Sequence, residues 1–366
     1  MLIISAGISS APNCGVIDYA RRLSTALEAL NFEVETIWAG PESGASPTRW
    51  LTDILRETCA SKGPAALILH YSVFAYAWRG VPLWVPQLAR RLRRLGVPVV
   101  LFAHEFIYPW RNNQGWRGAV KAATQRLVLI PLATAANEVI VTTEERMSWL
   151  CTRWWLPKRR VAFVPVFANI VPLARTNVVP MSQKVGLFGF GTEGLPVDVV
   201  CKAVSDVRRT FLNAQLTLIG APGPTSPVAD RWRDAAMTWG CPLTFTGIAE
   251  PEDVSREIAA CELMLFPDPA GPTSRRTSLA TLLCHGQPVV ALDGPERWAD
   301  LCDARAVSLV NPTRSALVTG ISRLMSDDTE RAMLGERARL FYRDHLGPDL
   351  VAQALLPMLT AGQLQV

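Results

Sequence analysis

The chain has 366 residues, of which 49% are hydrophobic and 19% charged, a composition typical of folded proteins with large cores. This length exceeds that of one ordinary α/β domain and predicts two. The formal net charge of +5 is uneven, because residues 1–180 carry 20 Lys and Arg against 11 Asp and Glu. Since Lys121, Arg126 and Glu138 interrupt the most apolar region, no membrane-spanning helix is expected.

Alternating apolar and amphipathic segments predict a parallel, doubly wound α/β arrangement in the first half of the chain. The predicted strands are 2–6, 34–38, 66–70, 99–103, 138–142 and 161–165. The predicted helices are 16–30, 48–59, 85–95 and 119–136. A loop rich in Gly, Pro and Asn follows the first strand, and a longer loop follows the fourth.

Residues 169–182 lack periodicity and predict a linker, after which the pattern restarts. The second set of predicted strands is 184–188, 215–219, 243–246, 264–266, 288–291 and 306–309. The predicted helices between them are 197–210, 228–239, 252–260 and 278–284. We expect an N-terminal domain over residues 1–175, a second over 176–345, and a C-terminal helix over 346–366 that packs back on the first. Two such domains would face each other across a cleft, where ligands that carry phosphates bind.

The eight cysteines form no Cys-x-x-Cys pair and no cluster with histidine. Scattered thiols favour a reduced, cytoplasmic protein over a disulfide framework, and no metal site is expected.

Basic residues concentrate in two stretches of the first half, 88–96 and 149–160. The second interleaves tryptophan with Arg153, Lys158, Arg159 and Arg160. Tryptophan beside Lys and Arg suits an anionic membrane surface, at the inner face of which the protein would be peripheral. One helix that buries its tryptophans and leaves its arginines solvated is the alternative, and a nucleic-acid partner is not expected.

The segment 264–291 reads as strand, loop, helix and strand, with Arg275 and Arg276 just before the helix. The unpaired N–H groups of a helix start suit a phosphate, and arginine adds planar, bidentate donors. The alternative is an N-cap Ser or Thr beside two solvated arginines. Because the loop follows the carboxyl end of a strand, where open sheets bind ligands, the sequence favours a phosphate site. The candidate residues of this loop are Thr273, Ser274, Arg275, Arg276, Thr277 and Ser278.

The stretch GFGTEG over 189–194 matches the dinucleotide-binding pattern G-x-G-x-x-G. A dehydrogenase also needs an acidic residue at the end of the next strand to bind the ribose hydroxyls. That strand ends in LTLIGAPGP without Asp or Glu, which disfavours an NAD-dependent oxidoreductase.

Several segments in order resemble the GT-B glycosyltransferases, specifically glycosyltransferase family 4, over nearly the whole length. The N-terminal ones are SAPNCGVIDYARRLSTAL (10–27), FAHEF (102–106) and VPVFANI (164–170). The C-terminal ones are GLFGFG (186–191), TGIAEPEDVSREIAACELMLFPD (246–268), HGQPVVA (285–291) and the stretch 310–339.

The resemblance implies two Rossmann-like domains of the GT-B type and a sugar transfer with retention of configuration. It implies a nucleotide-sugar donor, UDP- or GDP-linked, in the second domain, and a glycan or lipid-linked acceptor of polysaccharide biosynthesis in the first. No cofactor and no obligatory metal are implied.

Site residues follow from the same resemblance. His104 would lie near the transferred sugar, and Glu105 would orient the acceptor hydroxyl. Asn13 and Gly15 would let backbone approach the donor phosphates or the acceptor sugar. The donor-binding set also includes Gly189, Gly191 and Thr192.

The chain departs from the family at two places. The family's two glutamates, about eight positions apart, correspond to Thr273 and Thr281, and the loop after Gly189 contains Glu193 but no basic residue. Arg275 and Arg276 would then supply the charge that stabilises the diphosphate leaving group. A non-catalytic binder of nucleotides or sugars is therefore the alternative function.

Overall fold

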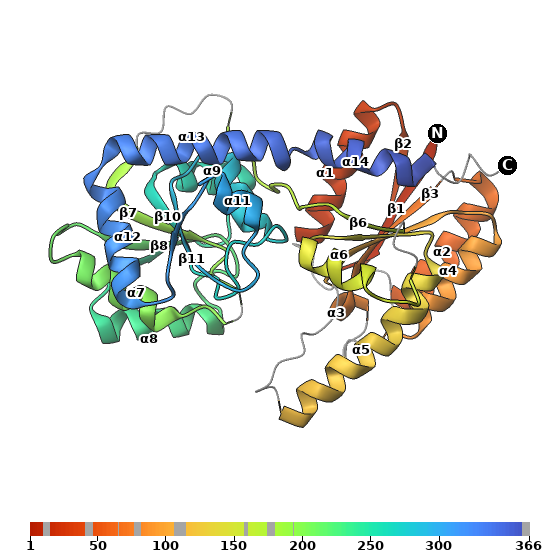
Figure 1. The fold of residues 1–366 in the computed structure, drawn as a ribbon, viewed down its shortest axis with the longest axis horizontal. Helices are drawn as coiled ribbons and strands as arrows, with labels where there is room; N and C mark the ends of the chain where they lie inside the picture. Colours follow the sequence, from red (N-terminus) through yellow and green to blue (C-terminus); the bar gives the residue numbers. More distant parts are fainter. Residues whose placement is uncertain are drawn as a thin grey trace. The chain divides into compact units, whose positions relative to one another are not determined.

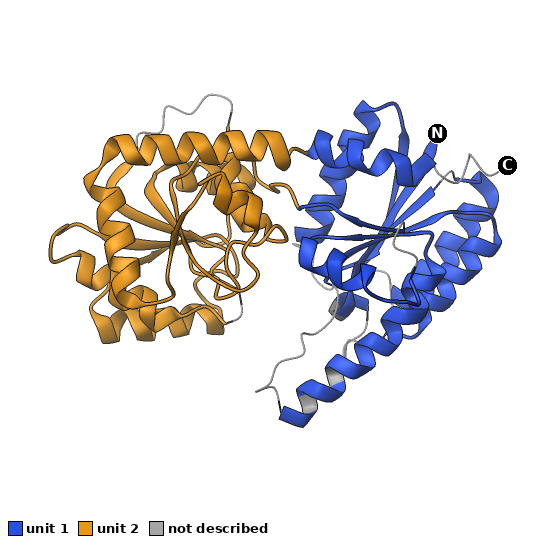
Figure 2. Ribbon diagram, viewed as in Figure 1, with its two compact units in different colours: residues 1–165, 348–366 blue, residues 166–347 orange. Residues whose placement is uncertain are grey.

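The computed structural model describes residues 1–9, 15–40, 47–64, 66–76, 82–105, 115–156, 160–173, 180–192 and 194–360. The chain forms two compact units (Figure 2). Unit 1 comprises Met1–Pro165 and Pro348–Val366, and unit 2 comprises Val166–Gly347. The boundary between the units therefore lies after Pro165, whereas the sequence predicts it after residue 175.

Unit 1 is built on a parallel six-stranded sheet in the order β2-β1-β3-β4-β5-β6 (Figure 1). Its strands are β1 (Leu2–Ile8), β2 (Glu33–Ala39), β3 (Ala66–Ser72), β4 (Val99–Glu105), β5 (Glu138–Val141) and β6 (Val161–Phe163). The central strands are buried along nearly their whole length, as expected for a parallel sheet covered on both faces.

Helices cover both faces of this sheet. They are α1 (Gly15–Ala29), α2 (Pro47–Lys62), α3 (Val73–Tyr76), α4 (Trp84–Arg94), α5 (Gly115–Ala135), α6 (Glu144–Cys151) and α14 (Pro348–Thr360). One core cluster packs α2, α4 and α5 on the face that contains Leu67, Leu69 and Leu101. On the other face, Tyr19 of α1 contacts the ring of Phe102, and α14 packs on α1.

Unit 2 repeats the scheme, with a parallel sheet in the order β12-β11-β10-β7-β8-β9. Its strands are β7 (Met181–Phe188), β8 (Gln215–Ile219), β9 (Leu243–Phe245), β10 (Cys261–Phe266), β11 (Val289–Leu292) and β12 (Ser308–Val310). Its helices are α7 (Val197–Val207), α8 (Pro227–Trp239), α9 (Pro251–Ala259), α10 (Thr277–Cys284), α11 (Ala299–Asp303), α12 (Arg314–Ser326) and α13 (Asp328–His345). The helices α7, α8 and α12 share one core cluster, and α10 packs against α13.

Each sheet has one point where the strand order changes direction. In unit 1 the chain places β2 on one side of β1 and then β3 on the other side. In unit 2 it places β8 on one side of β7 and later β10 on the other side. Ligands of open α/β sheets bind at such a switch point, outside the carboxyl ends of the strands. We therefore expect ligand sites at the carboxyl ends of β1 and β3 in unit 1 and of β7 and β10 in unit 2.

The structure confirms the predicted α/β class with two doubly wound domains. Three short helices, α3, α6 and α11, were not predicted. The predicted linker over 169–182 was too long, because β7 begins at Met181.

Candidate functional site

The switch point of unit 2 brings the loop after β7 against the first turn of α10. Gly189 has a φ of +84°, and a Cβ added there would lie 3.1 Å from the Ser278 Cβ and 3.2 Å from its Oγ. Both the positive φ and the close approach require glycine at this position. Two predicted donor-binding residues, Gly189 and Ser278, are thus neighbours in the structure.

Thr192 and Gly191 shape the same loop. The Thr192 hydroxyl donates to the Gly189 carbonyl at 3.0 Å, and its backbone N–H donates to the same oxygen at 3.1 Å. A Cβ at Gly191 would lie 2.9 Å from Cδ of Pro222, which follows β8. The structure gives these two residues a role in the turn, and their contact with a donor stays a prediction.

The β10–α10 loop is fastened to the loop that follows β11. Backbone N–H groups of Glu296 and Trp298 donate to the carbonyls of Ala270 at 2.8 Å and Pro272 at 2.9 Å. A Cβ on Gly294 would lie only 2.3 Å from the carbonyl carbon of Ala270. This close backbone contact holds the arginine-bearing loop in one shape.

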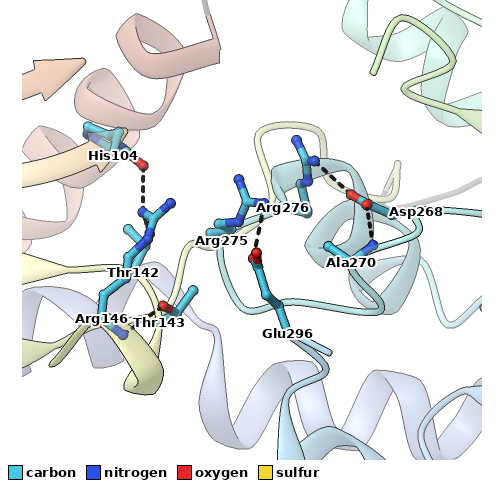
Figure 3. A network of polar contacts seen from close by, with 9 residues as sticks. All are labelled: His104, Thr142, Thr143, Arg146, Asp268, Ala270, Arg275, Arg276 and Glu296. Atoms are coloured by element: carbon cyan, nitrogen blue, oxygen red, sulfur yellow. Dashed lines mark hydrogen bonds and ion pairs between the residues drawn. The ribbon is translucent and has the colours of Figure 1, made fainter. Parts of the chain in front are cut away.

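Both arginines of this loop form ion pairs within unit 2 (Figure 3). The Arg275 guanidinium lies 3.2 Å from the Glu296 carboxylate, and that of Arg276 lies 2.7 Å from the Asp268 carboxylate. Asp268 is only 5% exposed. Burial lowers the pKa of Arg276, an effect that Asp268 opposes, and the guanidinium remains charged at neutral pH.

The idea of two solvated arginines is therefore wrong, and sequence reasoning missed both carboxylates. Asp268 could have been found, because it follows β10 closely. Glu296 lies in a different loop, and its approach to Arg275 depends on the packing of the two loops.

The first turn of α10 has hydrogen-bond donors without a partner among the described residues. Its N-cap is Arg276, and no side chain caps the helix. The hydroxyls of Thr277 and Ser278 have no hydrogen-bond partner among the described residues. Uncapped N–H groups and the positive end of the helix dipole attract an anion.

Two buried threonines stand where the resemblance implied carboxylates. The side-chain hydroxyls of Thr273 and Thr281 are buried and have no partner within the described part of the chain. Ser274, next to Thr273, accepts a backbone hydrogen bond from Val166 at 2.9 Å. The predicted residues 273–278 thus surround the start of α10.

The switch point of unit 1 holds a row of three hydrogen-bonded side chains. Ser5 Oγ lies 3.1 Å from His70 Nε2, and His70 Nδ1 lies 2.9 Å from His104 Nε2. Burial lowers the pKa of His70 to about 3 and that of His104 well below its usual range, where His70 and Arg146 add to the effect. Both rings are therefore neutral at physiological pH. Sequence reasoning found His104 but missed Ser5 and His70.

A register shift presents His104 at the strand end. The pairing of β3 with β4 passes from Tyr71–Ala103 to Ser72–Glu105, so that His104 is the extra residue. Such a bulge redirects a side chain. The Arg146 guanidinium donates to the His104 carbonyl at 3.1 Å and to the Thr142 hydroxyl (Figure 3).

Glu105 is exposed and accepts a hydrogen bond of 2.6 Å from the Ser72 hydroxyl. Gly15 begins α1, and Asn13 lies outside the described residues. The structure therefore brings His104 and Glu105 to the carboxyl edge of the sheet in unit 1.

The basic stretch 149–160 is not one helix, because α6 ends at Cys151. The Arg153 guanidinium lies over the Trp149 ring, 4.7 Å from its centroid. Trp154 is 95% exposed, while Lys158 and Arg159 lie outside the described residues.

Within the described ranges, no three His, Cys, Asp or Glu side chains are grouped to hold a metal ion. Among the described helices, none is long and apolar enough to cross a membrane.

No protein-family model matches the chain, and no curated protein matches it in sequence. Solved structures match it over its whole length. WaaG, a glycosyltransferase involved in lipopolysaccharide biosynthesis, is 14% identical with a TM-score of 0.65, covering 98% of this chain and 100% of WaaG. A glycosyltransferase from Rickettsia africae is 10% identical with a TM-score of 0.70, covering 100% and 99%. The UDP-GlcNAc 2-epimerase from Neisseria meningitidis, bound to UDP-GlcNAc, is 10% identical with a TM-score of 0.64, covering 99% and 100%.

At these identities the likeness concerns the fold. The chain has two Rossmann-like domains of the GT-B type, as the sequence predicts.

Proposed function

We propose that this protein is a glycosyltransferase that uses a nucleotide sugar, with the donor diphosphate bound at the start of α10. The observation that carries the proposal is the uncapped start of this helix at the switch point of unit 2, with two arginines beside it. A diphosphate accepts hydrogen bonds from backbone N–H groups, hydroxyls and guanidinium groups, all of which are present here.

In this proposal the donor diphosphate competes with two carboxylates for the arginines. Asp268 and Glu296 keep the arginines compensated, because an unpaired buried charge is costly. An incoming diphosphate, with more negative charge than one carboxylate, would compete for the same guanidinium groups. The arginines would then stabilise the charge that develops on the leaving diphosphate.

The donor is UDP- or GDP-linked in this proposal. Support comes from the Neisseria epimerase, which has the same fold and was solved with UDP-GlcNAc. The transfer retains configuration and needs no metal, as the family resemblance implies. His104 contacts the transferred sugar, Glu105 orients the acceptor hydroxyl, and unit 1 binds a glycan or lipid-linked acceptor.

The test is release of nucleoside diphosphate from a panel of nucleotide sugars with candidate acceptors. The product is then examined by NMR for the configuration of its anomeric carbon. Donor binding without release, across glycan and lipid-linked acceptors, would make the protein a non-catalytic binder.

Epimerisation of a nucleotide sugar is the second candidate function, because an epimerase shares the fold over its full length. The two reactions differ in their products. Incubation of each nucleotide sugar alone, followed by NMR, would show a new nucleotide-linked or free epimer only if the protein epimerises its substrate.

We further propose that unit 1 docks on anionic membrane, which would make the protein peripheral at the inner face of the membrane. The exposed arginines of α4 and exposed apolar side chains of the neighbouring α5, among them Leu127 at 69%, support this. Figure 1 shows the N-terminal part of α5 extending away from the sheet of unit 1. The exposed arginines of α4 are Arg90, Arg91, Arg93 and Arg94.

Vesicle flotation tests this docking. Replacing the four α4 arginines by Gln is expected to release the protein from acidic vesicles, and raised salt should act in the same way. Replacing four exposed arginines of unit 2, Arg209, Arg231, Arg256 and Arg343, by Gln is the matched control. Binding that survives both the α4 replacements and high salt would refute the proposal.

A further inference from the structure

We propose that Ser5 and His70 fix His104 as a neutral imidazole with its proton on Nδ1, which makes it a hydrogen-bond donor to an oxygen of a bound ligand. Ser5 and His70 are positioning residues in this account. The protonation pattern is a property of the protein alone. The identity of the ligand oxygen, a sugar hydroxyl, rests on the proposed function.

The three side chains lie on one face of the sheet in unit 1 and come from three adjacent strands. Gly7 of β1 pairs with His70 of β3, and His70 pairs with Phe102 of β4. Ser5 lies two residues before Gly7 and therefore on the same face. The His104 ring stacks on the rings of His70 and Phe102, which places it on this face as well. The bulge at His104 ends the row at the carboxyl edge of the sheet.

The proton pattern follows from the buried hydroxyl at the start of the row. Ser5 is 2% exposed, and His70 Nε2 is its only side-chain partner among the described residues. A buried O–H group needs an acceptor, so the hydroxyl donates to Nε2. A neutral imidazole has one protonated nitrogen, which places the His70 proton on Nδ1.

The same rule then determines which ring nitrogen of His104 carries the proton. Because His70 Nδ1–H donates across 2.9 Å to His104 Nε2, the proton of His104 is on Nδ1. This Nδ1 has no partner among the described residues. In the reverse pattern both rings would be protonated on Nε2, and His70 would donate to Ser5. The buried Ser5 hydroxyl would then have no acceptor.

The surroundings keep both rings neutral. The groups of neighbouring elements that face them are aromatic or cationic, and no carboxylate contacts either ring within the described part of unit 1. These groups are Tyr19 of α1, Trp38 of β2, Phe102 of β4 and Arg146 of α6. Two protonated rings at this separation would also repel each other.

Close packing fixes the ring planes. A Cβ at Gly7 would lie 2.5 Å from the Trp38 ring, so glycine makes room for this indole, whose ring centroid lies 5.6 Å from that of His70. The Tyr19 ring meets His104 edge-on at 5.1 Å, and Phe102 stacks on His104 at 4.6 Å. These ring contacts restrict rotation of both imidazoles.

A fixed Nδ1–H donor cannot accept a proton on that nitrogen, so His104 is not a general base in this arrangement. It is suited to bind an oxygen acceptor and to orient it.

Nitrogen NMR of the protein labelled with ¹⁵N-histidine tests the inference without any substrate. The chain has four histidines, so replacing each singly by Gln assigns the spectrum. We expect His70 and His104 both protonated on Nδ1 and not on Nε2. Protonation of His104 on Nε2, or of both its nitrogens at pH 7, would overturn the inference.

Variants of Ser5 add a second measurement. Ser5→Ala removes the hydrogen bond that His70 Nε2 accepts, so its ¹⁵N resonance should move to that of an unbonded ring nitrogen, while Ser5→Thr should retain the wild-type position. Ser24→Ala, at a buried serine of α1, is the matched control. If the spectrum shows both rings protonated on Nδ1 but no nucleotide sugar is turned over, the proposed function is wrong and the inferred protonation of His70 and His104 is still supported.

Discussion

Unit 1 should lose stability as the pH falls, because His70 is buried and neutral. Its pKa is lowered from an ordinary value of 6.5 to about 3, and it is 1% exposed. The unfolded chain binds a proton at this residue below pH 6.5, whereas the folded chain does so only near pH 3. The folded state therefore binds fewer protons in this window, and its stability decreases as the pH drops from 6.5 towards 3.

The magnitude follows from linkage. Well below pH 6.5, each further pH unit removes about 1.4 kcal/mol until His70 itself is protonated. At pH 5 the loss from His70 alone is about 2 kcal/mol, a large part of the stability of a typical domain.

The assay is urea unfolding at pH 7.5 and pH 5, read by pulsed hydrogen exchange in peptides from β1 and β3 so that unit 1 is followed separately. We expect the acid-induced loss to be about 2 kcal/mol smaller in His70→Phe than in the wild type. The exposed His345 of unit 2 is the control, and His345→Gln should leave the loss unchanged. Equal losses in the wild type and in His70→Phe would refute the reasoning.

Three further predictions concern unit 2. Glu296→Gln should tighten binding of a nucleoside diphosphate severalfold by titration calorimetry, because it frees Arg275 from a competing carboxylate; weaker binding would contradict this. Gly189→Ala should destabilise unit 2 by about 2 kcal/mol in urea unfolding, through its positive φ and its approach to Ser278; a neutral result would contradict the geometry. Thr281→Val should stabilise unit 2 by about 1 kcal/mol, since it removes a buried hydroxyl with no partner among the described residues; a loss of stability would show that this hydroxyl is bonded.

Much of the fold could be predicted from the sequence, because both sheets are parallel and covered by helices. Such strands are short, continuous apolar runs, and the helices between them have an amphipathic period. The short helices α3, α6 and α11 were missed because a single helical turn or two has little periodicity to detect.

The candidate site was predictable only where it depends on local chain order. Arg275 and Arg276 stand directly before a helix, so their position at its start follows from the sequence. The pairing of Arg275 with Glu296 depends on how two loops pack, whereas Asp268 precedes Arg276 in the same loop and could have been found. His70 lies within an apolar run and looked like any strand residue, although both β3 and β4 carry a histidine near their carboxyl ends.

The proposed donor site places the diphosphate of a nucleotide sugar at the start of α10 in unit 2. Titration calorimetry with UDP and GDP, on the wild type and on a variant with Arg275→Ala and Arg276→Ala, tests it most directly. We expect one of the two nucleotides to bind the wild type and the double replacement to weaken its affinity by at least fiftyfold, while the exposed control pair Arg209→Ala and Arg256→Ala leaves it unchanged. Unchanged affinity in the double variant, or no binding of either nucleotide to the wild type, would refute this binding site.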